Sequence, residues 1–270
     1  MQLRELEGYS AFKPMPRGGG MTDLYLATDQ EGRQVVLRVI KSSHHKERAI
    51  RKQFLHGIDV LKKLDHPNII RLLDYGKIHG HPWMSVAFYE GQDLRERIAN
   101  HDTHLHTYAY RLVYQLAETL WYLHRSGYLH MDLKPENILI THEMQPILID
   151  FDLAMRHKYR SLKVKKLSGT AHFLAPETYH NHIIDERAEI FAFGAAMYEL
   201  LSGHKPFLAD SSHDYKRKLM DLHTQPAAIR HHRAGVAASL EMVILKCLAK
   251  RREDRYPSMS LVLKDLEAVL

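Results

Sequence analysis

The sequence predicts an α+β protein of two lobes, in which a small antiparallel β-sheet with one long helix precedes a mainly α-helical lobe. Three observations support this fold class. Residues 9–41 contain runs of β-branched and aromatic side chains, which favour strands. One amphipathic helical pattern at 46–64 separates them from two more β-rich runs at 69–75 and 83–88. Beyond residue 104 apolar residues recur at helical spacing, so the rest of the chain is expected to be mostly helical.

The first lobe is expected to begin with a β-hairpin. Its strands lie at 24–27 and 35–40, and residues 29–32 between them are of turn-forming types. A run of three glycines precedes the hairpin: Gly18, Gly19 and Gly20. Successive glycines can bring backbone N–H groups close to phosphates, although such a run is equally typical of a flexible linker.

The helix expected at 46–64 has an inner face with apolar side chains at three- and four-residue steps. They are Ile50, Phe54, Ile58, Leu61 and Leu64. Gly57 lies on the same face, and residues 65–68 are expected to end the helix. After the two following strands we place a hinge at 86–90, so that the first lobe covers 1–88 and the second covers 91–270.

The second lobe is expected to contain several buried helices. Apolar residues between Leu112 and Leu123 form one stripe, and Ser126 with Gly127 is expected to end that helix. The segment 185–207 has a continuously apolar core, which is typical of a fully buried helix. The chain then finishes on a last amphipathic helix.

Composition narrows the class of protein. With 270 residues, 45% of them hydrophobic and 26% charged, the chain can bury one large core or two lobes. The single cysteine, Cys247, excludes an intrachain disulfide and is expected to be a buried, inert thiol. Because no window approaches ~18 uninterrupted apolar residues and the N-terminus carries acids, we expect a soluble, cytoplasmic protein without a membrane span.

The basic charge suggests partners without identifying them. The net charge is +6, but most basic residues are scattered, so nucleic-acid binding is not expected. The exception is a basic segment made of Arg156, His157, Lys158, Arg160, Lys163, Lys165 and Lys166. It is either a solvated loop or a docking surface for an acidic sequence or a phosphate. The chain has 21 histidines, but their pairs lack zinc-binding spacing, so we expect surface histidines rather than a metal site.

Two short stretches carry the chemistry, HMDLKPEN at 130–137 and LIDFDLA at 148–154. Asp132 can accept a hydroxyl proton, and Lys134 can neutralise a moving phosphoryl group. Asn137 and Asp150 offer the hard oxygen atoms that Mg²⁺ prefers. Four side chains thus cover positioning, metal and charge, which indicates phosphoryl transfer.

These stretches, followed by GTAHFLAPE at 169–177 and by Arg255, resemble eukaryotic-type (Hanks-type) serine/threonine protein kinases, especially the compact bacterial members. The resemblance covers nearly all of the chain and implies a protein kinase domain over 1–270. It implies ATP with Mg²⁺ or Mn²⁺ as cofactors and protein substrates as partners, acidic ones among the candidates. It says nothing of the oligomeric state.

The resemblance also assigns roles to individual residues. The catalytic residues are Asp132 as base and Lys134 as phosphate contact, and the metal ligands are Asn137 and Asp150. Nucleotide contacts fall on Gly18, Gly19, Gly20, Leu24, Val36, Arg38, Val86 as gatekeeper, Ala87 and Tyr89 through their backbones, and Leu139. The activation segment contains Asp152, Ser161, Ser168, Thr170 and Glu177, of which Ser161, Ser168 and Thr170 are candidate phosphorylation sites. Structural support falls on His130, Phe151, Glu189 and Arg255, the last as the partner of Glu177.

Several positions depart from the kinase pattern. Arg38 stands where the third strand normally presents a phosphate-binding lysine, and Gly57 stands where the helix normally presents that lysine's glutamate partner. We therefore expect the usual ion pair to be absent, because glycine offers no carboxylate. Glu47 is a poor replacement, since it lies ten residues before Gly57 and thus about 15 Å from it along the helix axis. Arg17 and Thr22 replace two glycines of the phosphate-binding loop, so that loop is expected to cover the phosphates less closely.

Three further departures surround the catalytic loop. Asp152 replaces a glycine, and we expect it to adopt a positive φ and to add a carboxylate that recruits a second ion or slows nucleotide release. Met131 replaces the arginine that normally pairs with an activation-segment phosphate, so activity should not require phosphorylation there. Glu189 replaces an aspartate that braces the catalytic loop, with its charge unchanged.

Three functions therefore stay open. The favoured interpretation is a serine/threonine protein kinase, because Asp132, Lys134, Asn137 and Asp150 are all present. The second is a pseudokinase that holds nucleotide and signals by shape, as the changes at Arg38 and Gly57 suggest. The third, a small-molecule kinase, is opposed by the peptide-binding segment that GTAHFLAPE resembles.

Overall fold

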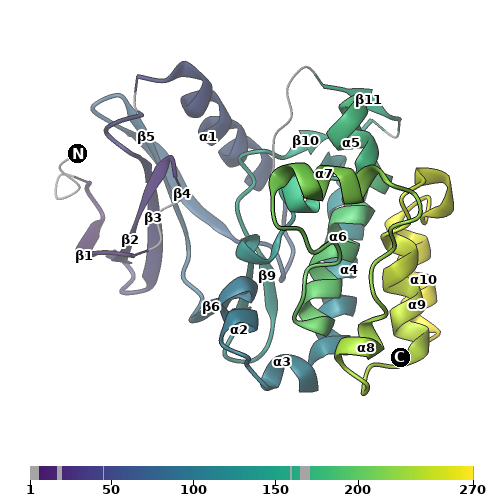
Figure 1. Ribbon diagram of the computed structural model, residues 1–270. Helices are drawn as coiled ribbons and strands as arrows, with labels where there is room; N and C mark the ends of the chain where they lie inside the picture. The colour runs from purple at the N-terminus through teal and green to yellow at the C-terminus, as the bar shows by residue number, and fades with distance from the viewer. Residues whose placement is uncertain (1–5, 17–19, 45, 159, 165–170, 270) are drawn as a thin grey trace. The chain divides into compact units, whose positions relative to one another are not determined.

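The structure is a computed structural model that describes residues 6–16, 20–44, 46–158, 160–164 and 171–269 (Figure 1). Its contacts divide the chain into two compact units. The first unit is Met1–Glu90 together with Asp150–Asp152, and the second is Gly91–Ile149 together with Leu153–Leu270. The short segment 150–152 therefore belongs with the N-terminal part of the chain, although it is distant from that part in sequence.

The first unit contains a five-stranded antiparallel sheet and one long helix, which confirms the predicted fold class for this part (Figure 1). Its elements are β1 (Tyr9–Pro14), β2 (Thr22–Asp29), β3 (Gln34–Ile40), α1 (Arg48–Leu61), β4 (Leu72–Ile78) and β5 (His81–Ala87). The strand order is β1-β2-β3-β5-β4. The predicted hairpin is confirmed as β2 and β3, which pair from Thr22 opposite Ile40 to Thr28 opposite Gln34.

The side chains of the central strand β3 alternate between the two faces of the sheet. Val35, Leu37 and Val39 are buried in the core with Trp83 of β5. Val36 and Arg38 point to the other face. The sheet therefore presents Arg38 away from the apolar core but still supported by the strands on each side.

Helix α1 begins two residues later and ends three residues earlier than the predicted 46–64. Its buried residues include Ile50, Phe54 and Gly57, as the apolar pattern predicts, and it packs against β4 and β5. The strand predicted at 69–75 is observed three residues later, as β4. The reason is a turn, in which the N–H of Ile69 donates to the carbonyl of His66 and delays the strand.

The second unit is mainly helical, with short strands around its loops. Its helices are α2 (Leu94–Ala99), α3 (His104–Thr107), α4 (Ala109–Arg125), α5 (Pro176–Asn181), α6 (Glu186–Ser202), α7 (Ser212–Met220), α8 (Ile229–His232), α9 (Ala238–Cys247) and α10 (Met259–Glu267), with 3-10 turns η2 (Pro135–Asn137), η3 (Ala171–Phe173) and η4 (Arg252–Asp254). Its strands are β6 (Gly91–Asp93), β7 (Tyr128–Leu129), β8 (Ile138–Thr141), β9 (Pro146–Leu148), β10 (Met155–Arg156), β11 (Leu162–Lys163) and β12 (Ile183–Ile184).

Helices α4 and α6 form the centre of this unit and pack against each other, with α10 on α4 and α9 on α6 (Figure 1). Helix α4 ends at Arg125, with Ser126 as its C-cap followed by Gly127 at φ 80°, as predicted. Helix α6 is buried along nearly all its length. It ends at Ser202 and is capped by Gly203, which has the positive φ of 75° that is typical of a C-cap glycine. Asp185 caps its N-terminus by accepting a hydrogen bond from the N–H of Ala188.

The catalytic stretch lies in the loop between β7 and β8. Strand β7 pairs with β10, so the chain that follows residue 152 returns beside the start of this loop. The N–H of Ile149 donates to the carbonyl of Asn137, which ties the second stretch to the end of the loop. Among the described helices, none is long and apolar enough to cross a membrane.

Candidate active site

Two side chains of the loop at 130–137, here called the catalytic loop, contact Asp132. Lys134 places its Nζ 2.6 Å from Oδ2 of Asp132. Asn137 donates from its amide nitrogen to the same Oδ2, at 2.9 Å, and to the backbone carbonyl of Asp132, at 2.8 Å. Two side chains from the same short loop therefore fix the orientation of the Asp132 carboxylate. With the amide nitrogen of Asn137 turned toward Asp132, its amide oxygen is the atom suited to a cation.

His130 anchors the start of the loop. It is fully buried, its Nδ1 accepts from the N–H of Asp132 at 3.3 Å, and its Nε2 lies 3.0 Å from the carbonyl of Ile149. An acceptor role at Nδ1 assigns the proton to Nε2, which then donates to Ile149. The ring thus joins the catalytic stretch to the residue that precedes Asp150 in sequence.

Glu189 of α6 links the catalytic loop to His124 of α4. Its Oε1 accepts from the N–H of Met131 at 2.8 Å, and its Oε2 lies 2.6 Å from Nε2 of His124. His124 and Glu189 are both buried. Burial alone would lower the pKa of His124, but its contacts with Glu186 and Glu189 outweigh burial and raise this pKa to about 9. The positive His124 in turn holds the pKa of Glu189 below its ordinary value, although burial opposes it.

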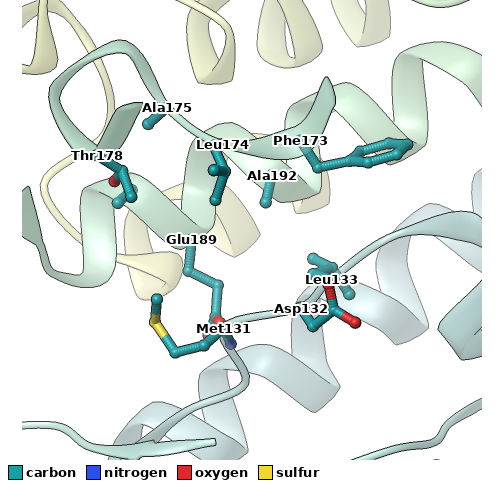
Figure 2. A pocket seen from close by; sticks show the side chains of 10 residues that line it. Met131, Asp132, Leu133, Phe173, Leu174, Ala175, Thr178, Glu189 and Ala192 are labelled. Atoms are coloured by element: carbon teal, nitrogen blue, oxygen red, sulfur yellow. The ribbon is translucent and has the colours of Figure 1, made fainter. Parts of the chain in front are cut away.

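A cavity of about 30 Å³ lies between the catalytic loop and the segment that follows η3 (Figure 2). In Figure 2, Glu189 points toward Met131, while Phe173 and Leu174 lie on the opposite side of the cavity. This volume accepts a water molecule rather than a ligand. The cavity therefore marks where the segment at 173–175 lies over the catalytic loop.

Glu177 and Arg255 form a buried ion pair, the partnership that the resemblance implies. Two parallel hydrogen bonds join them, from Nη1 to Oε1 at 2.7 Å and from Nη2 to Oε2 at 2.8 Å. Arg255 also donates to the carbonyls of Ala249, Arg187 and Lys250. The pair ties the segment that covers the catalytic loop to the C-terminal helices.

Arg38 of the first unit holds two acidic side chains. Its Nη1 and Nη2 donate to Oδ1 and Oδ2 of Asp152, at 3.0 and 2.8 Å, and Nη2 also lies 3.2 Å from Oδ1 of Asp150. Nε donates to Oγ1 of Thr22 at 3.3 Å, and the guanidinium lies 5.6 Å from the centre of the Phe54 ring. Burial tends to lower the pKa of Arg38, but Asp152 and Asp150 outweigh it and raise this pKa, so the guanidinium stays charged.

Arg38 therefore does form an ion pair, although not the usual one with a carboxylate of α1, and the sequence did not predict its partner. The partner is Asp152 rather than a residue of α1. The expected positive φ at Asp152 is wrong, because the left-handed backbone lies two residues earlier, at Asp150 with φ 64°. Asp152 itself begins a turn with Leu153 and directs its carboxylate at Arg38.

The sequence did not predict three contacts that the structure shows in these sites. They are Asp152 with Arg38, Thr22 as a further acceptor for Arg38, and His124 with Glu189. One signal could have found the first, since the chain lacks a carboxylate at Gly57 and has an unexpected one at Asp152. No sequence signal pointed to His124.

The residues assigned to adenine follow from the strand register. Leu24 pairs with Arg38, and Val36 pairs with Val86, so these side chains share the face of the sheet that carries Arg38. The N–H of Ala87 donates to the carbonyl of Arg71 at 2.9 Å, so this N–H is already bonded within the protein. The remaining positions assigned to the nucleotide belong to different elements, since Tyr89 follows β5 and Leu139 lies in β8. Phe151, assigned to structural support, is buried.

Several predicted residues lie outside the described part of the chain. They are Arg17, Gly18, Gly19, Lys165, Lys166, Ser168 and Thr170. Gly20 is described, and a side chain there would meet nothing within 4 Å. Ser161 is exposed, and its hydroxyl donates to Asp185 at 2.8 Å and accepts from Arg252 at 2.9 Å.

The remaining groups offer little alternative chemistry. Cys247 is buried, and burial raises the pKa of its thiol, as expected of an inert cysteine. Within the described residues no three histidine, cysteine or acidic side chains cluster as a metal site. Oxygen atoms of Asn137 and Asp150 nevertheless have the chemistry that a hard divalent cation requires, and the guanidinium of Arg38 has the chemistry that phosphate requires.

The sequence is similar to those of known protein kinases. The family described as "Protein kinase domain" matches residues 18–265. The serine/threonine-protein kinase PknH of Mycobacterium bovis is 30% identical over 244 residues, which are 89% of this chain and 40% of PknH. PrkC of Bacillus subtilis is 30% identical over 93% of this chain and 38% of its own length. Calcium-dependent protein kinase 4 of Plasmodium berghei is 30% identical over 79% of this chain and 41% of its own length. The chain thus spans about two fifths of the length of these relatives.

Proposed function

This chain belongs to the protein kinase domain family, and on that premise we propose that it is a serine/threonine protein kinase that transfers the γ-phosphate of ATP to a protein hydroxyl. The observation that carries the proposal is the convergence of Lys134 and Asn137 on Asp132. A base must be held in one orientation to accept a hydroxyl proton in the transition state, and these two contacts hold it.

Each residue of the loop has a separate role in this proposal. Asp132 accepts the proton of the attacking hydroxyl, and Lys134 stabilises negative charge on the phosphoryl group as it moves. Asn137 and Asp150 would hold Mg²⁺ or Mn²⁺, which neutralises charge on the phosphates when bound. Arg38 contributes a fixed positive charge and two-point hydrogen bonding to phosphate oxygens.

The protein acceptor would bind along the segment at 173–177. Support comes from the position of this segment across the cavity from the catalytic loop and from the Glu177–Arg255 pair that holds it. The basic residues before it, among them Arg156, Lys158 and Lys163, suit an acidic acceptor sequence.

A second candidate is a nucleotide-binding protein without transfer activity. The observation that favours it is the engagement of Arg38 by two carboxylates, since a guanidinium that stays with them would not reach the phosphates. This candidate and the kinase differ in one outcome, which is the appearance of phosphate on protein.

The test is intact mass after incubation with ATP and either Mg²⁺ or Mn²⁺, with a generic basic protein and an acidic one as acceptors. If the chain is a kinase, we expect added phosphate on the chain or on an acceptor, and none with Asp132→Ala. Nucleotide-induced thermal stabilisation without any transfer would instead favour the nucleotide-binding protein. Phosphate that persists with Asp132→Ala would refute the role assigned to Asp132.

A further inference from the structure

Three departures from the kinase pattern, Arg38, Gly57 and Asp152, meet in one place in the first unit. We propose that Asp152 positions Arg38 for the phosphates of a nucleotide, and that Gly57 has no side chain because the Asp152 carboxylate occupies the space that its Cβ would need. The proposal rests on nucleotide use by this chain, as proposed above, but not on transfer.

The contacts of Arg38 divide into a tight set and a loose set. Both oxygens of Asp152 face the end of the guanidinium, at 3.0 and 2.8 Å from Nη1 and Nη2. The side formed by Nε and Nη2 has longer contacts, 3.3 Å to Thr22 and 3.2 Å to Asp150. A two-point contact of the first kind fixes both the position and the plane of a guanidinium. Asp152 is therefore the partner that orients Arg38.

Exposure separates the two carboxylates in the same way. The side chain of Asp152 is 8% exposed, and that of Asp150 is 38% exposed. Asp150 is therefore the more accessible of the two to solvent or to a cation. If Asp150 turns to solvent or to a cation, and Nε exchanges its long contact with Thr22 for a phosphate oxygen, the Nε and Nη2 side of Arg38 becomes a two-point donor of the geometry that suits two phosphate oxygens.

Gly57 supplies the space. A Cβ on Gly57 would lie 2.5 Å from Oδ1 of Asp152 and 3.3 Å from its N and Cα atoms. The first distance is too short for any real contact, so a side chain at this position would force the carboxylate of Asp152 out of the position in which it contacts Arg38. The chain has thus exchanged a carboxylate on the helix for one on the segment 150–152.

The same contacts argue against Asp152 as a metal ligand. Its Oδ1 and Oδ2 each already accept a hydrogen bond from Arg38. A cation bound to either oxygen would lie close to the guanidinium that already faces both of them, and the two positive groups would repel each other. The carboxylate therefore acts through Arg38.

Equilibrium binding to the full chain tests this role without requiring transfer. The probes are a non-hydrolysable ATP analogue with Mg²⁺ and adenosine, both measured by calorimetry. We expect Arg38→Met and Asp152→Asn each to weaken the ATP analogue about tenfold or more, because each removes charge-assisted hydrogen bonding. The double variant should bind no more weakly than Arg38→Met alone, and adenosine affinity should not change in any variant.

Two further variants complete the design. Gly57→Ala leaves Arg38 and Asp152 in the chain, and it should weaken the ATP analogue in the wild type but have little effect beside Asp152→Gly. Asp29→Asn is the matched control, because it removes a carboxylate from the surface pair with Arg33 in the same unit, and it should leave both affinities unchanged. Gly57→Ala also serves if Asp152→Asn does not fold.

Four results would overturn the proposal. They are a wild-type chain that binds no ATP analogue, Asp152 variants that bind it normally, effects of Arg38→Met and Asp152→Asn that multiply, and an equal loss of adenosine affinity. Multiplying effects would mean that Asp152 acts on the metal directly. A wild type that binds nucleotide through Arg38 but transfers no phosphate would refute the proposed kinase activity and leave this inference intact.

Discussion

Gly57→Ala is the change whose effect on stability follows most directly from the structure. In an ordinary helix interior, alanine in place of glycine stabilises the helix by about 1 kcal/mol. At this position the new Cβ would lie 2.5 Å from Oδ1 of Asp152, so the carboxylate must move away from Arg38. Overpacking of a filled site costs about 1–3 kcal/mol, and weaker contacts with Arg38 add to that cost. We therefore expect Gly57→Ala to lower the free energy of unfolding of the first unit by about 2 kcal/mol.

The control is the same substitution beside Asp152→Gly. The contact at 2.5 Å is then gone, and only the two backbone contacts at 3.3 Å remain. Gly57→Ala should then be close to neutral, within about 1 kcal/mol. The difference between the two backgrounds measures the coupling between positions 57 and 152.

Urea unfolding can be followed in the first unit alone. The chain has two tryptophans, Trp83 in β5 and Trp121 in α4. In a Trp121→Phe background the fluorescence reports only Trp83, which is buried in the sheet core. A Gly57→Ala chain that is more stable than its parent would refute the reasoning, because it would mean that the Asp152 carboxylate does not occupy this space.

Three other predictions concern the second unit. The pKa of His124 rises from 6.5 to about 9 on folding. Its contribution to the free energy of unfolding, about 3 kcal/mol, is therefore complete below pH 6.5 and is lost as pH rises through about 9. Urea unfolding followed by the fluorescence of Trp121 in α4 should show this fall, and a free energy of unfolding that does not change with pH would contradict it. The titratable groups that face His124 are Glu186, Glu189 and His157. Arg255→Lys retains the charge but not the two-point contact with Glu177, so it should lower the free energy of unfolding by about 3 kcal/mol, measured in the same way; a loss below about 1 kcal/mol would show that the pair is dispensable. Met131 offers no positive partner for a phosphate, so phosphatase treatment should leave the transfer rate unchanged; a large drop would show that another residue reads the phosphate.

The elements that the sequence predicted correctly are those determined by local patterns. The β2–β3 hairpin follows from alternating β-branched residues around a turn, and the end of α4 follows from Gly127, which can adopt a positive φ without strain. The catalytic loop is also local, because Asp132, Lys134 and Asn137 contact one another within six consecutive residues. The strand β4 was predicted three residues early, because a turn at Ile69 is not visible in apolar character.

The features that the sequence did not predict depend on residues far apart in the chain. Arg38 and Asp152 are separated by 114 positions, so neither periodicity nor a short motif relates them. His124 and Glu189 are separated by 65 positions and meet only because α4 packs on α6. The assignment of positive φ to Asp152 failed for a different reason, since replacing a glycine does not require that the new residue adopt the glycine's backbone conformation.

The ion pair of Arg38 with Asp152 bears on how a chain without the usual lysine and glutamate can be active. The family pattern suggests that losing the lysine and its glutamate removes the orienting contact for the phosphates. In this chain each lost function has a replacement within reach: a guanidinium in place of the ammonium, and Asp152 in place of a helix carboxylate. Positioning is the main contribution of a protein to phosphoryl transfer, so a pair rebuilt from other residues can support the reaction.

The most direct test of the central claim is the rate of γ-phosphate transfer from ATP, measured as a function of ATP concentration for the wild type, Asp132→Ala and Asp152→Asn. If Asp132 is the base and Asp152 positions Arg38 for the phosphates, Asp132→Ala abolishes transfer at every ATP concentration. Asp152→Asn then raises KM for ATP more than it lowers kcat, so that much of the rate returns at high ATP. A wild type that transfers no phosphate, or an Asp132→Ala chain that still transfers it, would contradict the central claim.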